Sequence, residues 1–450
     1  MQRIKINNFG PIEYFDSNIA QLSVLFGPQA SGKSTISKSV YFFKSLRDDF
    51  TKLLLDFLQS DAKGLSLTSY GKLIRKKFIN FFGPTYHIDK FSLEFSYTKE
   101  NILVISLKDK KKFVDPIFSD ALRRELFDLI NEVKNYKELR YKLNGTVTIF
   151  ERIYLDSQAE SFLKNLEKKI NTIFGDDREI LFIPAGRSLI STLSNKLSTI
   201  FKIKEFDEDV DYITKTFLEK IISTRELFTK SLKEIVDEQS LLTDNKIRYS
   251  RVNNATKLIY SILKGQYRYD NGKDKFILPN RRYVMLNYAS SGQQESVWIL
   301  YLLFLFILKN NNYFVVIEEP EAHLFPEAQR DIVLLIALFS NSNNNQTFVT
   351  THSPYVLATL NNLLYAYEIG QTNEKVTEVV SNQFWINPST SNVWFVSNGN
   401  CIDIIDDETK LISSDQLDSV STINNKVFED LFSLEGVGVH EHEHFSDLNS

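Results

Sequence analysis

The sequence predicts an α/β protein with a mainly parallel sheet, an antiparallel β-subdomain and a helical insertion. Short apolar runs, such as 22–26, 313–317 and 347–350, are each followed by a polar cluster and then by a helical pattern. This order is typical of a parallel sheet whose carboxyl ends carry the chemistry. Two other stretches differ in period: residues 90–118 alternate like an antiparallel meander, and residues 189–263 are charged and helical without strong breakers.

A phosphate-binding loop follows the first of these strands. Residues 27–34 read G-P-Q-A-S-G-K-S, between the strand 22–26 and an amphipathic helix expected over 35–46. Glycines let the backbone wrap around a phosphate, and the helix N-terminus points N–H groups at it. We expect Lys33 to reach the β- and γ-phosphates of a nucleotide and Ser34 to hold Mg²⁺.

Composition excludes several classes of protein. The 450-residue chain is long enough for two or three domains, and its net charge of −4 argues against a protein that coats nucleic acid without specificity. A single cysteine, Cys401, excludes an intrachain disulfide framework and a cysteine-based zinc site. The longest apolar run, 297–308, is shorter than the roughly 20 residues that cross a bilayer. We therefore expect a cytoplasmic protein with no membrane span.

The elements expected along the chain define its organisation. An edge-type strand at 3–9 is followed by the phosphate loop, amphipathic helix to Gly83, the meander, and helix again over 121–171. The second half adds a strand at 178–184, a strand pair around Asn271 and Gly272, and a helix at 326–339. We divide the chain into a core (1–47, 178–190 and 280–415), a helical and β-meander subdomain (48–177), a helical arm with a β-hairpin (191–279) and a C-terminal segment (416–450), whose tail we expect to be disordered.

Two consecutive carboxylates end the strand 313–317. Glu318 can hold a water of the Mg²⁺ shell, and Glu319 can polarise the water that attacks a phosphate. Pro320 disfavours a helical conformation at the residue before it, so we expect Glu319 to be extended. A pair of solvated acids at a helix start is the alternative, but the β-rich run and the upstream phosphate loop favour the catalytic interpretation.

Two weaker signals flank this acidic strand. Residues Ser290–Gln293 begin a helix and could bind a second anion, although small polar residues also commonly cap helices. His352 follows the next strand and could sense a γ-phosphate, although histidines at strand ends are often structural. The order of all four motifs along the chain is more informative than either signal alone.

In this order the motifs resemble those of the ABC-type P-loop NTPases. The stretches GPQASGKST, IPAGRS, SSGQQE, VVIEEPEAHLFPEAQ and TTHSPYVL are similar to a soluble OLD- and RecF-like branch of AAA-family ATPases. This branch includes the ATPases of the PARIS and Septu phage-defence systems. The resemblance implies an ATP hydrolase with Mg²⁺ as cofactor.

The resemblance also implies roles for individual residues. ATP would be bound by the Walker A residues Gly27, Pro28, Gln29, Ala30, Ser31, Gly32, Lys33, Ser34 and Thr35, and by the signature residues Ser290, Ser291, Gly292 and Gln293 of another subunit. Glu318 and Glu319 would be the Walker B pair, His352 the switch histidine, and Ser34 and Glu318 the metal residues. Many transporters have glycine in place of Ser291 and aspartate in place of Glu318, so both residues fit the soluble branch. Arg187 fits the P-A-x-R-S pattern of that branch without an assigned role, and no Q-loop glutamine can be placed.

Other charged clusters are interpreted as ordinary surface features. Only 98 residues follow His352, too few for the TOPRIM domain of OLD nucleases, so Asp403, Asp406 and Asp407 are expected in a surface hairpin. The basic clusters 75–77 and 110–112 could contact nucleic acid or an acidic partner, but solvated faces are preferred. The histidine-rich stretch 440–444 could bind a metal, but a disordered terminus is preferred.

We therefore expect an ATPase that forms a head-to-tail homodimer, or a larger homo-oligomer, around two ATP molecules. Resemblance implies a sensor or regulatory subunit in phage defence that controls a separate effector, such as a TOPRIM or HNH nuclease. One alternative is a RecF/SMC-like DNA-repair ATPase acting directly on DNA, although long coiled-coil heptads are missing. The other is an assembly scaffold that binds ATP with little turnover.

Overall fold

A six-stranded sheet forms the centre of the computed structural model, which describes residues 1–60, 64–85, 88, 90–107, 113–143, 149–193, 211–240, 246–279, 282–413 and 425–431. The strand order is β14-β13-β3-β12-β11-β7, and all strands but β14 run parallel. Their bounds are β3 Leu22–Phe26, β7 Glu179–Ile183, β11 Tyr313–Glu318, β12 Gln346–Thr351, β13 Ser391–Ser397 and β14 Asn400–Asp403. The predicted α/β fold with a mainly parallel sheet is confirmed.

Two hydrophobic cores cover the two faces of this sheet. Alternate residues of β11 face opposite sides, because successive side chains of a strand point to opposite faces. Val315 and Ile317 pack in the core with helices α10 (Lys246–Leu263), α11 (Ser291–Lys309), α12 (Pro326–Ser340) and α13 (Pro354–Gly370). Phe314 and Val316 pack in the core with helix α1 (Lys33–Gln59).

Helix α11 is long and apolar enough to cross a membrane by length and composition alone. However, 78% of its apolar window is buried against the rest of the chain. The expectation of a buried core helix is therefore confirmed for this segment. The helix ends at Lys309, where Asn310 adopts a left-handed conformation (φ 60°).

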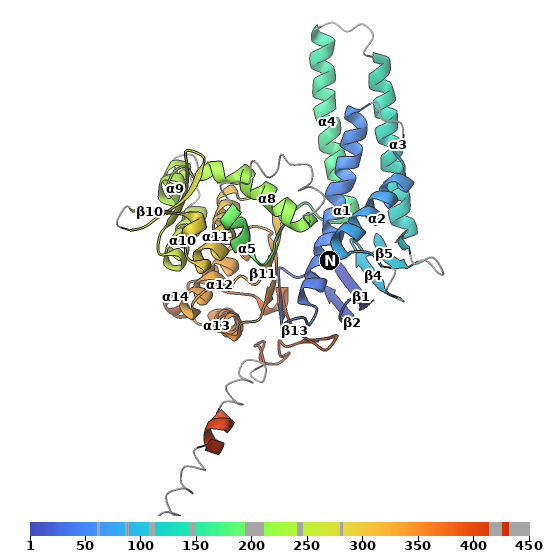
Figure 1. Cartoon of the computed structure of the whole chain (residues 1–450). Coiled ribbons are helices and arrows are strands. Elements are labelled where there is room, and N and C mark those ends of the chain that lie inside the picture. The colour runs from blue at the N-terminus through green and yellow to red at the C-terminus, as the bar shows by residue number, and fades with distance from the viewer. Residues whose placement is uncertain are drawn as a thin grey trace, which may run out of the picture.

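A five-stranded antiparallel sheet lies beside the central sheet, in the order β2-β1-β4-β5-β6 (Figure 1). Its strands are β1 Arg3–Phe9, β2 Ile12–Asn18, β4 Ser92–Ser96, β5 Ile102–Leu107 and β6 Val114–Phe118, and helix α2 (Leu67–Phe82) packs on it. The predicted meander is confirmed as β4-β5-β6. The expected edge position of residues 3–9 is wrong, because β1 pairs with both β2 and β4. Alternation reports which face of a strand is buried, not how many neighbours the strand has.

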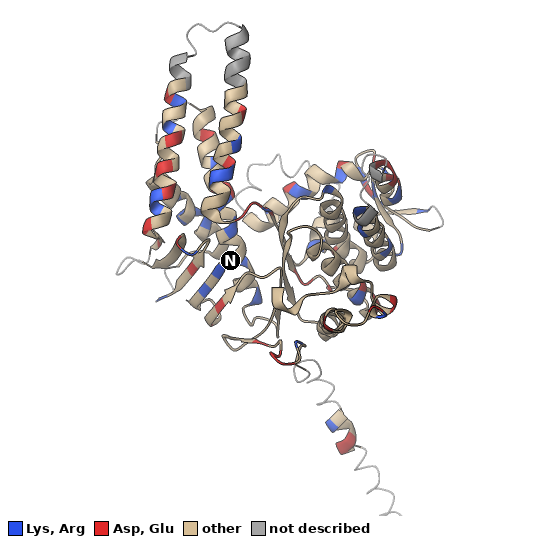
Figure 2. Cartoon of the chain, turned by 180° about the vertical axis from the view of Figure 1, so that it is seen from behind, with Lys and Arg blue, Asp and Glu red and all other residues tan. Residues whose placement is uncertain are grey.

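Helices α3 (Asp120–Leu143) and α4 (Ile149–Phe174) stand side by side and project from the region of the five-stranded sheet (Figure 1). They contact each other through Lys169 and Glu132, whose Nζ and Oε2 atoms are 2.7 Å apart, and through the stacked rings of Tyr136 and Phe162. Figure 2 shows acidic and basic residues interspersed along both helices. The arm of the molecule thus lies within 120–174.

The sequence predicted an arm over the range 191–279. The described parts of this range pack instead against the central sheet. Its elements are α8 (Tyr212–Arg225), η2 (Glu226–Phe228), α9 (Leu232–Ser240), α10, and the hairpin of β8 (Gln266–Asp270) and β9 (Lys273–Ile277), to which β10 (Tyr283–Met285) adds a third strand. The predicted turn is confirmed, since Asn271 and Gly272 both have positive φ (50° and 75°). The remaining short elements are η3 (Leu286–Tyr288), α14 (Val376–Val379), η4 (Asn382–Phe384) and η5 (Pro388–Thr390).

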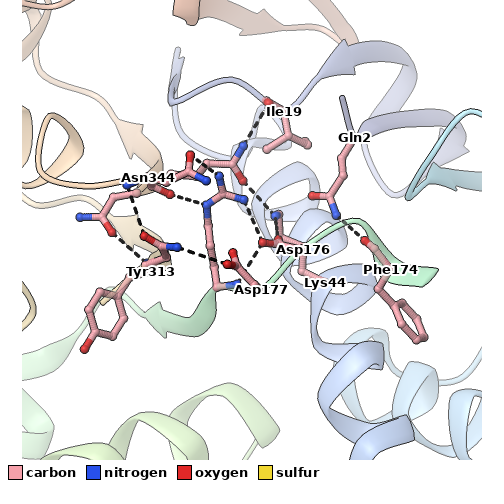
Figure 3. Close-up of polar contacts among 12 residues, drawn as sticks. Gln2, Ile19, Lys44, Phe174, Asp176, Asp177, Tyr313 and Asn344 are labelled. Carbon is pink, nitrogen blue, oxygen red and sulfur yellow. Dashed lines mark hydrogen bonds and ion pairs between the residues drawn. The ribbon is translucent and has the colours of Figure 1, made fainter. Parts of the chain in front are cut away.

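A buried polar network joins helix α1 to the central sheet at the amino ends of the parallel strands (Figure 3). Lys44 of α1 donates to Asp176 Oδ2 (2.5 Å), and Arg178 donates to the other oxygen of the same carboxylate (2.8 Å). Arg178 also donates to the carbonyl of Asn344 (2.6 Å), in the loop before β12. Burial lowers the pKa of Lys44 to about 8. The network ties α1, the base of α4 and the central sheet together at the end opposite the phosphate loop.

Candidate functional site

The carboxyl ends of β3, β11 and β12 meet at one cavity of about 270 Å³. Pro11, residues 29–35, Glu319 and His352 line it. The phosphate loop is therefore brought together with the second acidic residue and with the histidine, which lies 319 residues after Lys33 in the sequence. Glu318 lies beside this cavity and Ser290–Gln293 lie elsewhere.

Glycine is required at the start of the phosphate loop. Gly27 has φ +152°, and a Cβ atom there would lie 2.2 Å from the carbonyl oxygen of Val396 in the neighbouring strand. Helix α1 begins at Lys33 with Gly32 as its N-cap residue, and no side chain caps its N-terminus. Its first N–H groups are thus left for an anion in the cavity. The helix continues to Gln59, within the helical stretch that the sequence predicted between the loop and Gly83.

The Lys33 ammonium is hydrogen-bonded to the backbone of the phosphate loop. It donates to the carbonyl oxygens of Gly27 (2.8 Å) and Pro28 (2.7 Å), and lies 3.4 Å from Nδ1 of His352. The residue is only 5% exposed. Burial lowers the pKa of Lys33 to about 8, although the carboxylates of Glu319, Glu321 and Glu318 oppose this shift.

His352 links this lysine to the second acidic residue. Its Nε2 atom lies 2.9 Å from Glu319 Oε1, while Nδ1 faces the Lys33 ammonium. Since an ammonium can only donate, we assign Nδ1 as the acceptor and Nε2 as the protonated nitrogen that donates to the Glu319 carboxylate. The three side chains form a continuous polar chain across the cavity.

The backbone of Glu319 differs from the predicted extended conformation. Its φ is +44°, in the left-handed region. Its N–H donates to the Thr350 carbonyl (2.9 Å) and its own carbonyl accepts from Arg187 (2.8 Å). Pro320 does disfavour a right-handed helical conformation at Glu319, but these contacts select the left-handed one. Such a conformation costs on the order of 1–3 kcal/mol for a residue other than glycine, so the surrounding structure must stabilise it.

Glu318 lies behind Glu319 and is 6% exposed. Its carboxylate accepts from Ser37 Oγ (3.5 Å), in the first turns of α1, and from the Ala185 N–H (3.4 Å). Ser34 lies earlier on the same helix and lines the cavity. A hydroxyl and a carboxylate are the hard oxygen donors that Mg²⁺ prefers, so these residues fit the ion.

Sequence reasoning missed Glu321 as part of this site. Its Oε1 atom accepts from Thr351 Oγ1 (2.6 Å) and from the backbone N–H of His352 (2.9 Å). Its Oε2 atom is buried without a hydrogen-bond partner among the described residues. Glu321 therefore fixes the backbone that carries the histidine. The sequence marks Glu321 only as a third glutamate in the stretch E-E-P-E. This position lies beyond the strand, so no periodicity indicates where its side chain points.

The four residues predicted as the signature line a separate cavity. Ser290 caps α11: its Oγ accepts from the Gln293 N–H (3.4 Å), and Gln293 Oε1 accepts from the Ser290 N–H (3.2 Å). A Cβ atom on Gly292 would lie 2.7 Å from the His323 carbonyl oxygen, so only glycine fits this close approach. Ser290, Ser291, Gly292 and Gln293 line a cavity of about 390 Å³ that shares no residue with that of the phosphate loop.

The remaining charged clusters have structural partners. Asp406 accepts from the N–H groups of Glu408 and Thr409 in a turn after β14, and the described residues contain no group of three or more potential metal ligands. Lys77 pairs with Asp49 and is 6% exposed, so it is buried rather than solvated as predicted. Arg75 pairs with Asp115. The clusters 110–112 and 440–444 lie outside the described residues.

Comparison with known proteins gives a family match over more than half of the chain. A family model described as an AAA ATPase domain (AAA_15) matches residues 119–357, a range that includes the acidic strand and His352 but begins after the phosphate loop. No curated protein matches the chain.

Solved structures similar to this chain include three SMC head domains. One is from Thermotoga maritima (13% identity, 79% of this chain and 90% of that chain, TM-score 0.33). Another is bound to the C-terminal winged-helix domain of ScpA (13%, 79% and 91%, 0.38). The third has an extended coiled coil and is bound to the C-terminal domain of ScpA, and derives from Pyrococcus furiosus (11%, 90% and 96%, 0.36).

Proposed function

The chain belongs to the AAA_15 family of AAA ATPase domains, and from this premise we propose that it binds and hydrolyses ATP with Mg²⁺ in the cavity of the phosphate loop. The observation that carries the proposal is the polar chain Lys33–His352–Glu319 across that cavity. Phosphoryl transfer depends on positioning and electrostatic stabilisation, which need a cation, an anion-binding loop and a water-orienting base. All three line one cavity here.

Each residue then has a separate task. Lys33 would leave the carbonyls of Gly27 and Pro28 and bind the β- and γ-phosphates, because phosphate oxygens are stronger acceptors. Glu319 would accept a hydrogen bond from the attacking water and His352 would contact the γ-phosphate. Mg²⁺, held by Ser34 and through water by Glu318, would neutralise charge on the phosphates.

We propose further that two chains sandwich two ATP molecules head to tail. The support is that Ser290–Gln293 form the N-terminus of helix α11 and line a cavity of their own, apart from the phosphate loop of the same chain. A helix N-terminus of one chain placed against the γ-phosphate bound by the other would complete the site.

The biological role that we propose is regulation of phage defence in the cytoplasm. The motifs resemble those of PARIS and Septu ATPases, and this resemblance is the support for a sensor subunit that controls a separate nuclease. Steady-state hydrolysis with and without DNA tests the role. Strong stimulation by DNA alone would favour a DNA-repair ATPase, and ATP binding without turnover would favour an assembly scaffold.

Replacing Lys33 by alanine is expected to abolish ATP binding or to reduce turnover by at least about a hundredfold, since it removes the only cation that lines the cavity among the described residues. The measurements are calorimetric ATP affinity and phosphate release. Lys38→Ala, on the same helix but outside the cavity, is the matched control and should behave like the wild type. Wild-type affinity and turnover in Lys33→Ala would contradict the assignment.

ATP affinity is expected to fall as pH rises above about 8. In the free protein the pKa of Lys33 is lowered to about 8, whereas bound phosphates would raise it, so binding above this pH requires uptake of a proton. The loss should reach at most about tenfold per pH unit. Calorimetry between pH 7.5 and 9.5 measures it, and Lys33→Arg, whose guanidinium stays charged over this range, should remove the dependence. An affinity that stays constant in the wild type over this range would contradict the expectation.

A further inference from the structure

Arg187 is a fully buried arginine between the acidic strand and the signature helix. It is the first residue of helix α5 (Arg187–Leu193), separated from the end of β7 by three residues, and its side chain is 0% exposed. Burial lowers the pKa of its guanidinium, while the carboxylate of Glu295 opposes this shift most strongly. A buried charge needs good partners, because its desolvation is costly.

The partners of Arg187 are mainly backbone carbonyls. Four of the five N–H donors of its guanidinium are used: Nη1 donates to Pro184 (2.7 Å) and Glu318 (2.7 Å), Nη2 to Glu319 (2.8 Å) and Nε to Glu295 (2.7 Å). One rigid planar group thus holds three segments: the end of β7, the end of β11 and the first turns of α11.

Two of these contacts bear directly on the backbone of Glu319. The carbonyls of Glu318 and Glu319 are consecutive, and in a regular strand consecutive carbonyls point to opposite sides. Here both reach the same guanidinium, and the chain bends at Glu319, whose φ is +44°. The contacts of Arg187 therefore stabilise the conformation that directs the Glu319 carboxylate to His352, 2.9 Å away.

Glu295 attaches the same arginine to the helix that carries the signature. Its Oε2 accepts from the Arg187 N–H (2.9 Å) and its Oε1 from the Ser188 N–H (2.9 Å), so the carboxylate caps helix α5. Glu295 is 2% exposed and lies in the first turns of α11, close in sequence to Ser290–Gln293. The Ser191 hydroxyl adds a third contact, donating to the Gln294 carbonyl (2.7 Å).

We propose that Arg187, with Glu295, is a positioning residue that sets the backbone of Glu319 and couples it to the signature helix. The inference rests on the proposed ATPase function and adds a route by which contact at Ser290–Gln293 influences hydrolysis in the same chain. A shift of the first turns of α11 would move Glu295, then Arg187, and then the carbonyl of Glu319. The Arg187 side chain acts in this route without contacting the nucleotide.

Arg187→Lys tests the positioning role. Lysine keeps a positive charge beside Glu295 but cannot span Pro184, Glu318 and Glu319 with a planar fork. We expect kcat to fall about tenfold or more and the ATP Kd to stay within about threefold. Arg225→Lys is the matched control, because Arg225 is another buried arginine paired with a buried carboxylate, Asp274 (3.8 Å). We expect it to keep wild-type kcat.

A second variant separates positioning from stability. Arg187→Met combined with Glu295→Gln removes both buried charges, so neither is left uncompensated and folding should be preserved. We expect a cooperative thermal unfolding transition at a lower temperature than in the wild type, because four backbone carbonyls lose their donor, and a kcat still reduced about tenfold. Recovery of wild-type kcat in this double variant would overturn the proposal.

Crystal structures of the wild type and Arg187→Lys provide a readout that does not depend on hydrolysis. We expect the φ of Glu319 to leave the left-handed region in the variant and its carboxylate to separate from His352. If Glu319 keeps its conformation, or if kcat stays within about twofold of the wild type, the positioning role is wrong. A wild-type protein that does not hydrolyse ATP would instead overturn the proposed function, and the comparison of structures would still decide whether Arg187 sets the backbone of Glu319.

Discussion

Replacing Glu319 by glutamine is expected to slow ATP hydrolysis by about 10²- to 10⁴-fold while ATP still binds. Glutamine has nearly the same shape as glutamate and can still contact His352, so the change removes mainly the charge that polarises the attacking water. Glu318 and Lys33 keep their positions, because Lys33 donates to the carbonyls of Gly27 and Pro28 and Glu318 accepts from Ser37. The variant should therefore hold ATP and remain in the ATP-bound assembly.

Phosphate release and light scattering on the same sample test this expectation. Scattering with ATP should report a mass of at least a dimer for Glu319→Gln, persisting longer than for the wild type. Glu318→Gln is the comparison: it should weaken the response to Mg²⁺, since its buried carboxylate faces α1 at Ser37. Normal hydrolysis by Glu319→Gln with an inactive Glu318→Gln would mean that the two roles are exchanged.

In the proposed dimer each ATP site is composite, because it combines the phosphate loop of one chain with Ser290–Gln293 of the other. Ser290→Arg is expected to abolish cooperative hydrolysis and to leave ATP binding at the phosphate loop of the same chain intact. Ser290 lies at the N-terminus of α11, in a cavity separate from the loop. A bulky cation there would block the close approach of a partner's phosphate loop.

Mixing two inactive proteins should restore activity. In a heterodimer of Ser290→Arg and Lys33→Ala chains, one composite site combines two intact halves and the other combines two altered halves. If the sites act independently, each heterodimer should have about half of the wild-type rate, and an equimolar mixture with free exchange about a quarter. Absence of rescue would mean either obligatory coupling of the two sites or a wrong sandwich geometry.

A crosslink separates these two explanations. The chain has one cysteine, Cys401, so Cys401→Ser provides a background in which cysteines at Gln29 and Ser291 are the only thiols. Both positions line their respective cavities. An ATP-dependent crosslink between subunits supports the sandwich, and its absence rules out this geometry.

Much of the nucleotide site could be predicted because its signals are local. The G-x-x-x-x-G-K-S spacing places Lys33 at the first position of α1, and the capping of α11 by Ser290 and Gln293 involves residues three apart. The apolar run of β11 indicates a strand buried on both faces, and Glu318 ends that strand. These features depend on neighbouring residues in the chain, so periodicity and composition are sufficient to reveal them.

The parallel α/β core, the phosphate loop, the acidic strand end and the helix cap could thus be predicted from local patterns in the chain. Tertiary structure alone decided the place of β1 inside its sheet, the left-handed backbone of Glu319, the support of His352 by Glu321, and the contacts of Arg187. Arg187 reaches carbonyls 131 and 132 residues away, and Glu321 reaches the His352 backbone 31 residues away. Such contacts depend on strand order and register, which local periodicity does not specify, because the same alternation is compatible with several neighbours on either side of a strand.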